Sequence, residues 1–133
     1  MFNRIGAVII LVSDMKKSME FYKDVLGMEL KQQAEDWIEF SKQGTVLALH
    51  PAKKKMKQTK NTSMLIGFNV SELETICSNL ESKNVKFHKK VTNEAFGKHA
   101  IIEDPDGHLI SLAEMTPKEE FTQIPYYHGF APE

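Results

Sequence analysis

The chain has 133 residues, of which 41% are hydrophobic and 26% are charged, and its formal net charge is −1. This composition is typical of one soluble globular domain, and it argues against a disordered chain and against attraction to nucleic acid or membranes through overall charge. Cys77 is the single cysteine. An internal disulfide is therefore impossible, which is typical of a reducing compartment, and we expect a cytoplasmic protein.

The first half of the chain predicts a strand, a helix and three further strands. The apolar run at residues 5–12 is too short to span a membrane and is typical of a strand covered on both faces. Asp14 is a suitable N-cap for a helix whose apolar residues recur at helical spacing and which ends at Gly27. Three strands are then predicted at residues 28–32, 37–41 and 45–50.

The second half repeats this order of elements. Residues 65–70 alternate as in a strand, and Ser71 and Glu74 have the spacing of a capping box, which predicts a helix that ends at Asn84. The Asp-Pro-Asp-Gly turn at 104–107 predicts a hairpin. The three strands of this half are predicted at residues 85–89, 98–103 and 108–113. The sequence therefore predicts an α+β fold of two tandem βαβββ modules that share a core.

We expect residues 1–133 to form one domain. Its parts are a first module at residues 5–50, a lysine-rich linker at 51–63, a second module at 64–114 and a tail at 115–133. The linker is interpreted either as a basic rim near an anion-binding site or as a solvated connection. The aromatic tail either closes over the binding site or contacts a second subunit.

Two segments carry a resemblance to a known family, "LVSDMKKSMEFYKDVLGMEL" after the first strand and "FGKHAIIEDPDGHLISLAE" near the end. With the repeat, they resemble the vicinal oxygen chelate superfamily, which includes glyoxalase I, methylmalonyl-CoA epimerase, extradiol dioxygenases, fosfomycin-resistance enzymes and bleomycin-resistance proteins. The resemblance covers roughly residues 5–114. It implies cupped mixed sheets with the helices on the outer face. Because this scaffold hosts both enzymes and plain binders, it does not specify the function by itself.

Metal enzymes of this family take one ligand, usually His, from the first strand of each module and another, usually Glu, from the last strand. The resemblance places these positions at Ala7 and Ala48 in the first module and at Leu65 and Ser111 in the second. Alanine and leucine offer no donor atom, and a serine hydroxyl is a poor ligand unless it is deprotonated. We therefore predict no metal and no other cofactor, and we expect Ser111 to hydrogen-bond a bound ligand or a backbone group.

Strand alternation identifies the side chains of the predicted cup floor. This face is mostly small and apolar, which suits a small, partly apolar or aromatic ligand, and the alternative is a cup filled by its own side chains or by a partner subunit. The predicted ligand-binding residues are Ile9, Leu11, Trp37, Ala48, His50, Leu65, Asn69 and Ser111.

His50 is the candidate catalytic residue, because at the mouth of the cup it can act as an acid, a base or a hydrogen-bond donor. Its alternative role is that of a surface residue beside Pro51. Trp37 either stacks on a planar ligand or covers the core. A metal site rebuilt from His50 with His99 or Glu39 is a further alternative that spacing leaves open.

The sequence thus predicts a homodimeric, metal-free protein of the bleomycin-resistance type that binds a small molecule, with no nucleic-acid or membrane partner. The alternative is an enzyme, either a lyase or isomerase of the lactoylglutathione-lyase type or a dioxygenase-type enzyme. That enzyme would use rebuilt metal ligands or metal-free acid–base chemistry at His50. The sequence leaves open whether the cup forms within one chain or across a dimer.

Overall fold

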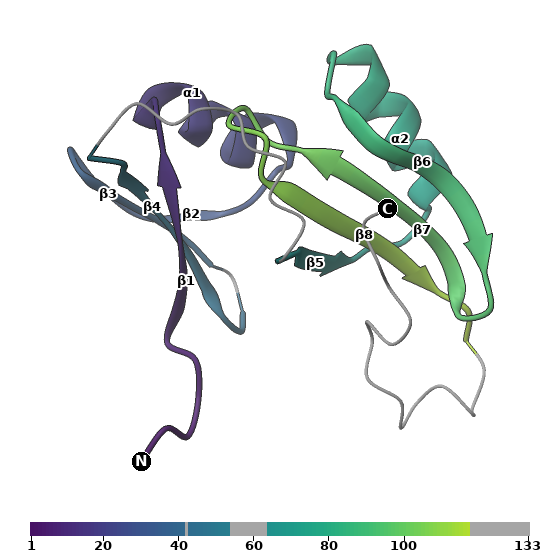
Figure 1. Cartoon of the computed structure of the whole chain (residues 1–133), viewed down its shortest axis with the longest axis horizontal. Helices are drawn as coiled ribbons and strands as arrows, with labels where there is room; N and C mark the ends of the chain where they lie inside the picture. Colours follow the sequence, from purple (N-terminus) through teal and green to yellow (C-terminus); the bar gives the residue numbers. More distant parts are fainter. Residues whose placement is uncertain (42, 54–63, 118–133) are drawn as a thin grey trace. The chain divides into compact units, whose positions relative to one another are not determined.

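The computed structural model describes residues 1–41, 43–53 and 64–117 of the chain (Figure 1). It divides into two compact units, residues 1–59 and 60–133. Each unit contains a four-stranded mixed sheet and a helix, in the order strand, helix, three strands. The predicted α+β fold of two tandem βαβββ modules is confirmed. The aromatic residues of the tail and most of the lysine-rich linker, for which the sequence suggested alternative roles, lie outside the described residues.

The first unit builds one sheet in the order β1-β4-β3-β2. Strand β1 runs parallel to β4, and the other neighbours are antiparallel. The elements of this unit are β1 (Ala7–Val12), α1 (Met15–Glu20), the π-helical turn η1 (Phe21–Val25), β2 (Leu30–Ala34), β3 (Trp37–Phe40) and β4 (Val46–Pro51).

The helix of the first unit begins and ends as its sequence predicts. The side chain of Asp14 accepts a hydrogen bond of 3.0 Å from the backbone N–H of Lys17, which satisfies a free donor of the first turn. After α1 the chain continues as the single π-helical turn η1. Gly27 then adopts a φ of 74°, the left-handed conformation that ends a helix with little strain when the residue is glycine.

One face of the first sheet packs against α1 and η1 and forms the core of this unit. The ring of Tyr22 is fully buried, and its centroid lies 5.1 Å from that of Phe21 and 6.2 Å from that of Phe40. The buried strand side chains on this face are Ile10, Val12, Ile38, Phe40, Leu47 and Leu49. Because strand side chains alternate, the residues between them lie on the opposite face of the sheet.

The second unit repeats this sheet in the order β5-β8-β7-β6, with β5 parallel to β8. Its elements are β5 (Ile66–Asn69), α2 (Leu73–Ser82), β6 (Phe87–Glu94), β7 (Gly97–Glu103) and β8 (Leu109–Met115). The two registers correspond, because Ile9 pairs with Ala48 in the first sheet and Gly67 with Ser111 in the second. These pairs place Ala48 and Ser111 at equivalent positions of the two sheets, as the sequence predicts.

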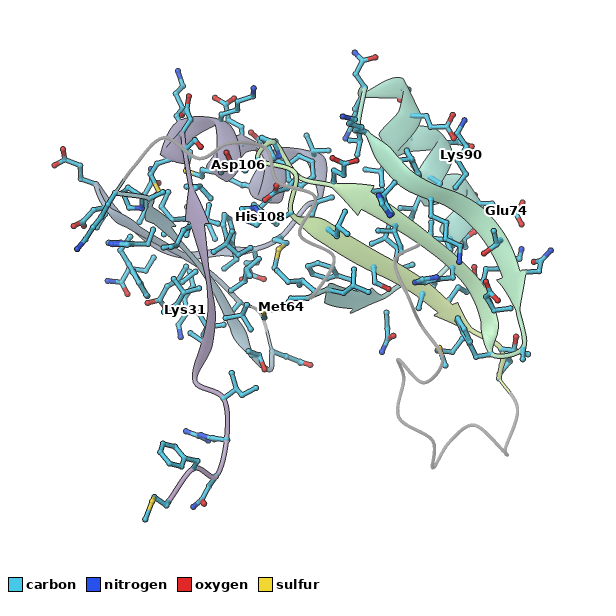
Figure 2. All side chains as sticks on the ribbon, viewed as in Figure 1. Lys31, Met64, Glu74, Lys90, Asp106 and His108 are labelled. Carbon is cyan, nitrogen blue, oxygen red and sulfur yellow. The ribbon has the colours of Figure 1, made fainter. Side chains whose placement is uncertain are left out.

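The start of α2 differs from the prediction. Ser71 and Glu74 do not form a capping box, and the N-cap is Glu72, which has a φ of 56° and makes no side-chain cap. Instead the backbone N–H of Leu73 donates a hydrogen bond of 2.9 Å to Oε1 of Glu114 in β8. A carboxylate at a helix N-terminus is favoured by the free N–H groups and by the helix dipole, so a residue distant in sequence replaces the local cap. Glu74, labelled in Figure 2, pairs with Lys98.

The hydrogen bond between Leu73 and Glu114 also identifies the two faces of the second sheet. Glu114 lies on the face that α2 covers, and α2 packs against β6 and β8 (Figure 1). Residues of opposite parity in β8, including Ser111 and Ala113, therefore lie on the face away from α2. Asn84 adopts a φ of 62° just after the helix, so its predicted role in ending α2 is confirmed.

The turn between β7 and β8 has the predicted chemistry. The carboxylate of Asp104 accepts hydrogen bonds from the backbone N–H groups of Asp106, at 2.9 Å, and of His108, at 2.8 Å. Gly107 adopts a φ of 87°. His108 and Asp106 are labelled at this turn in Figure 2. The turn fixes the register of β7 against β8, and that register determines which side chains meet on the face away from α2.

Candidate functional site

The face of the first sheet opposite α1 carries five of the predicted ligand-binding residues. Ile9 pairs with Ala48, and Leu11 pairs with His50, across the parallel strands β1 and β4. Ile9 is 52% exposed and Leu11 is 48% exposed, so the prediction that their strand is covered on both faces is wrong within the single chain. The residues on this side of the sheet, called the open face below, are Ile9, Leu11, Trp37, Glu39, Ala48 and His50. Trp37, Glu39 and His50 are half-buried, and Ala48 is fully buried beneath its neighbours.

Trp37 is held in place on the open face by two neighbours. Its indole N–H donates a hydrogen bond of 2.6 Å to Oε2 of Glu39, two residues along the same strand. The centroid of its ring lies 6.0 Å from that of the His50 imidazole, at an interplanar angle of 57°. Two fixed contacts reduce the entropy that the half-exposed ring would lose on stacking against a ligand.

His50 is oriented by the backbone of the turn that joins β2 to β3. Its Nδ1 lies 2.8 Å from the carbonyl oxygen of Asp36. A carbonyl oxygen only accepts hydrogen bonds, so Nδ1 carries the proton, and in the neutral ring Nε2 is the unprotonated nitrogen. The structure thus gives the candidate catalytic residue a defined tautomer whose Nε2 can accept a proton.

The corresponding face of the second unit contains a buried pair of polar side chains. Oγ of Ser111 lies 2.7 Å from Nε2 of His99, and the two residues are 0% and 1% exposed. The sequence did not name this histidine partner, and the expectation that the hydroxyl of Ser111 binds a ligand stays a prediction. Because burial disfavours the charged imidazolium, the pKa of His99 lies below its ordinary value.

Charged neighbours surround His99 on the adjacent strand. Lys89 and Glu94 of β6 form an ion pair at 3.3 Å, and the hydroxyl of Thr92 donates to the same Glu94 oxygen at 3.0 Å. After burial, the positive charge of Lys89 also lowers the pKa of His99, while Glu94 acts in the opposite direction. The ring of Phe96 contacts the imidazole edge-on, with 5.9 Å between the centroids.

The sequence contained a signal for the contact between His99 and Ser111. The turn at 104–107 pairs Ile101 with Ser111 and His99 with Ala113. Side chains of equal parity in β7 and β8 therefore lie on one face, and His99 is the diagonal neighbour of Ser111. Once the hairpin register is set by its turn, this contact follows from counting residues.

The other two predicted ligand-binding residues also belong to the second unit. Asn69 pairs with Ala113 and is exposed, and Leu65 immediately precedes β5 and is half-buried. Gly67, between them, pairs with Ser111. The structure thus places Leu65, Asn69 and Ser111 on or beside the strand pair β5 and β8.

Comparison with known proteins assigns the family. The family model of the Glyoxalase/Bleomycin resistance protein/Dioxygenase superfamily matches residues 4–112. The chain belongs to this superfamily. It is 30% identical over 131 aligned residues to the metallothiol transferase FosB of Staphylococcus saprophyticus, covering 96% of this chain and 85% of that protein.

Two further proteins show how varied the relatives are. The chain is 27% identical to the lactoylglutathione lyase of Schizosaccharomyces pombe over 94% of its own length, but it spans only about half, 53%, of that enzyme. The antibiotic-binding protein TnmS3 of Streptomyces sp. CB03234 has a similar fold, with a TM-score of 0.68 and 22% identity over 86% of this chain and 97% of that one. Enzymes and a binding protein thus share this scaffold.

The family resemblance places the superfamily's metal ligands at four positions of this chain. Ala7, Ala48 and Leu65, at three of these positions, provide no donor atom, and the hydroxyl of Ser111, at the fourth, contacts His99. Within residues 1–41, 43–53 and 64–117, no three His, Cys, Asp or Glu side chains are grouped as metal ligands. Among the helices of the described chain, none is long and apolar enough to span a membrane.

Proposed function

We propose that this protein is a cytoplasmic, homodimeric member of the superfamily that binds a small, partly apolar or aromatic molecule without a metal. The observation that supports the proposal is that Ala7, Ala48, Leu65 and Ser111 occupy the four positions where the family resemblance places the metal ligands. Three of these side chains have no donor atom. The fourth, Ser111, is buried against His99.

The open face supports the binding part of the proposal. Ile9 and Leu11 leave about half of their surface in water, beside a tryptophan whose orientation is fixed by Glu39 and His50. An apolar surface with a few oriented polar groups is the usual lining of a small-molecule site.

Elemental analysis of the untagged protein, purified without chelators and without a nickel column, tests the metal-free part. We expect far less than one equivalent of any transition metal. One full equivalent of a single metal would contradict the proposal and would point to ligands other than the four positions above.

Ligand screening with the intrinsic fluorescence of Trp37 tests the binding part, because Trp37 is the only tryptophan. Planar aromatic compounds should quench its emission in a saturable manner. The double variant Ile9→Asn and Leu11→Asn should lose this response. The matched control is Ile5→Asn, since Ile5 is also exposed but precedes β1, and this variant should respond like the wild type. Equal responses of both variants would contradict a site on the open face.

A second candidate is a metal-free acid–base enzyme that uses His50. The defined tautomer of His50 favours it, because Nε2 is the nitrogen that is free of a proton in the neutral ring. Assays for lactoylglutathione lyase and thiol transferase activity, the activities named for the two relatives, are the first tests. His50→Gln should abolish any turnover without unfolding the protein, and His88→Gln, in the second unit, is the matched control. Activity that survives in His50→Gln would exclude this candidate.

A further inference from the structure

We propose that Glu39 makes the open face selective for a positively charged planar ligand, namely a flat aromatic ring system that carries a protonated amine or amidine. This inference rests on the proposed binding function and adds the charge of the ligand to it. It depends on the position of one carboxylate among apolar side chains and beside the indole of Trp37.

The carboxylate of Glu39 lies in a row of apolar side chains. Glu39 pairs with Ala48 across β3 and β4, and Ala48 pairs with Ile9 across β4 and β1. Because Ala48 ends at its Cβ, only a methyl group separates the carboxylate from Ile9 along this row. Ala48 itself is fully buried, so a planar molecule would lie on the exposed side chain of Ile9 and bring its edge toward the carboxylate of Glu39.

The charge of Glu39 is not balanced by a basic residue of the described chain. Its Oε2 accepts the indole N–H of Trp37, which is a neutral donor. Three ion pairs join Lys89 to Glu94, Lys98 to Glu74 and His108 to Asp104, and none of them includes Glu39. A ligand that covers the carboxylate removes it from water, and this desolvation is offset only when the ligand supplies a positive charge or strong donors.

Trp37 adds a second preference for a cation at the same place. The face of an indole ring is electron-rich and attracts ammonium or guanidinium groups within about 6 Å. The hydrogen bond to Glu39 fixes the ring next to the carboxylate, so both groups attract the same end of a ligand. Glu35 and Asp36, in the turn next to Trp37, add negative charge, whereas Lys31 of β2 directly precedes Gln32, the residue that pairs with Glu39. An anionic ligand would be repelled here.

A pair of probes that differ in charge tests the inference. At pH 7.5, 9-aminoacridine is a planar cation, whereas acridine has the same three rings and is neutral. Isothermal titration calorimetry should show that 9-aminoacridine binds about tenfold more tightly than acridine. In Glu39→Gln, which keeps an oxygen to accept the indole N–H, the affinity for 9-aminoacridine should fall about tenfold, so that the two probes bind alike.

Glu20→Gln is the matched control, because Glu20 is an exposed carboxylate on α1, on the opposite side of the sheet. It should keep the tenfold preference for the cation at physiological ionic strength, since exposed distant charges are screened. Equal affinities for the two probes in the wild type, or an unchanged ratio in Glu39→Gln, would overturn the charge selectivity while binding itself stands. Failure of both probes to bind would overturn the selectivity together with the proposed function.

Discussion

The two units share one strand-pairing scheme but differ on the face that their helices leave uncovered. In the first unit this face exposes about half of Ile9 and Leu11. In the second unit the same face buries Ser111 and His99 completely, and the two side chains are hydrogen-bonded to each other. The helix-side faces are similar in both units, because each buries mainly apolar strand residues; Glu114, which caps α2, is a charged exception in the second unit.

The pairing registers allow this difference to be assigned position by position. Glu39 faces Ala48 in the first sheet, and Ile101 faces Ser111 in the second. Each pair therefore has one polar and one apolar side chain. The polar one lies on β3 in the first sheet and on β8 in the second. The comparison shows that strand pairing and the helix-side core define this fold. The opposite face carries different side chains in the two units, and these side chains determine the chemistry of a site.

The largest expected effect comes from truncating Ile101. Ile101→Ala should lower the free energy of unfolding by about 3 kcal/mol, because Ile101 is fully buried and a cavity would remain. The variant at the equivalent position of the first unit, Glu39→Ala, should cost about 1 kcal/mol or less, because Glu39 is only half-buried. Urea denaturation measures both values. Similar losses in the two variants would show that the two faces do not differ in burial as described.

The buried hydrogen bond of the second unit should have the next largest effect. Ser111→Ala should lower the free energy of unfolding by about 2 kcal/mol, because it leaves a buried ring nitrogen of His99 without this partner. A double-mutant cycle with His99→Leu isolates the contact, and the coupling energy should be about 1 kcal/mol. Strict additivity of the two substitutions would contradict a stabilising contact between these side chains.

A smaller effect is expected on the open face. Ile9→Ala should lower the free energy of unfolding by less than about 1 kcal/mol, because Ile9 already contacts water over half of its surface. Its neighbour Ile10 is buried on the helix side and is the natural control, and Ile10→Ala should cost about 3 kcal/mol. If Ile9→Ala proved as costly as Ile10→Ala, the open face would be covered in solution.

The smallest effects concern pH and two histidines of the second unit. The pKa of His99 is below 6.5 in the folded protein, so its contribution to stability is present above that pH and is lost as the pH falls. The hydrogen bond to Asp104 raises the pKa of His108 above 6.5, so its contribution is present below that pH and is lost as the pH rises.

Melting temperatures measured between about pH 5 and pH 8 test whether His99 and His108 contribute to stability with opposite pH dependences. His99→Gln should make the protein less sensitive to acid than the wild type. His108→Gln should remove stability mainly on the acidic side, where the imidazolium pairs with Asp104. A change of the same sign in both variants would contradict the two environments.

Much of the fold could be predicted from the sequence because its signals are local. Gly27, Asn84 and Gly107 have positive φ values where the sequence required them. Strand β6 extends to Glu94, well past the predicted end at residue 89. The prediction missed this extension because the residues at the end of the strand are mostly polar and lack an apolar alternation. Their backbone is instead paired along β7, with two register shifts, and such pairing has no local signature.

The candidate site was likewise predicted only in part from the sequence. Alternation within single strands was sufficient to place Ile9, Leu11, Ala48 and His50 on one face of the first sheet. It did not identify Glu39 as the partner of Trp37, although the two lie on one strand, because indole and carboxylate at this spacing are also compatible with separate contacts to water.

The sequence by itself determined the duplicated order of elements and the register of the repeat, because these depend on residue types and spacing. The replacement of the four metal ligands stays a prediction from the family resemblance. Tertiary structure alone decided that Glu114 caps α2 and that Ser111 meets His99. It also decided that Ile9 and Leu11 stay half exposed. The physical reason is that hydrogen bonds and burial between distant segments depend on the folded backbone, which brings together residues whose local sequences contain no sign of each other.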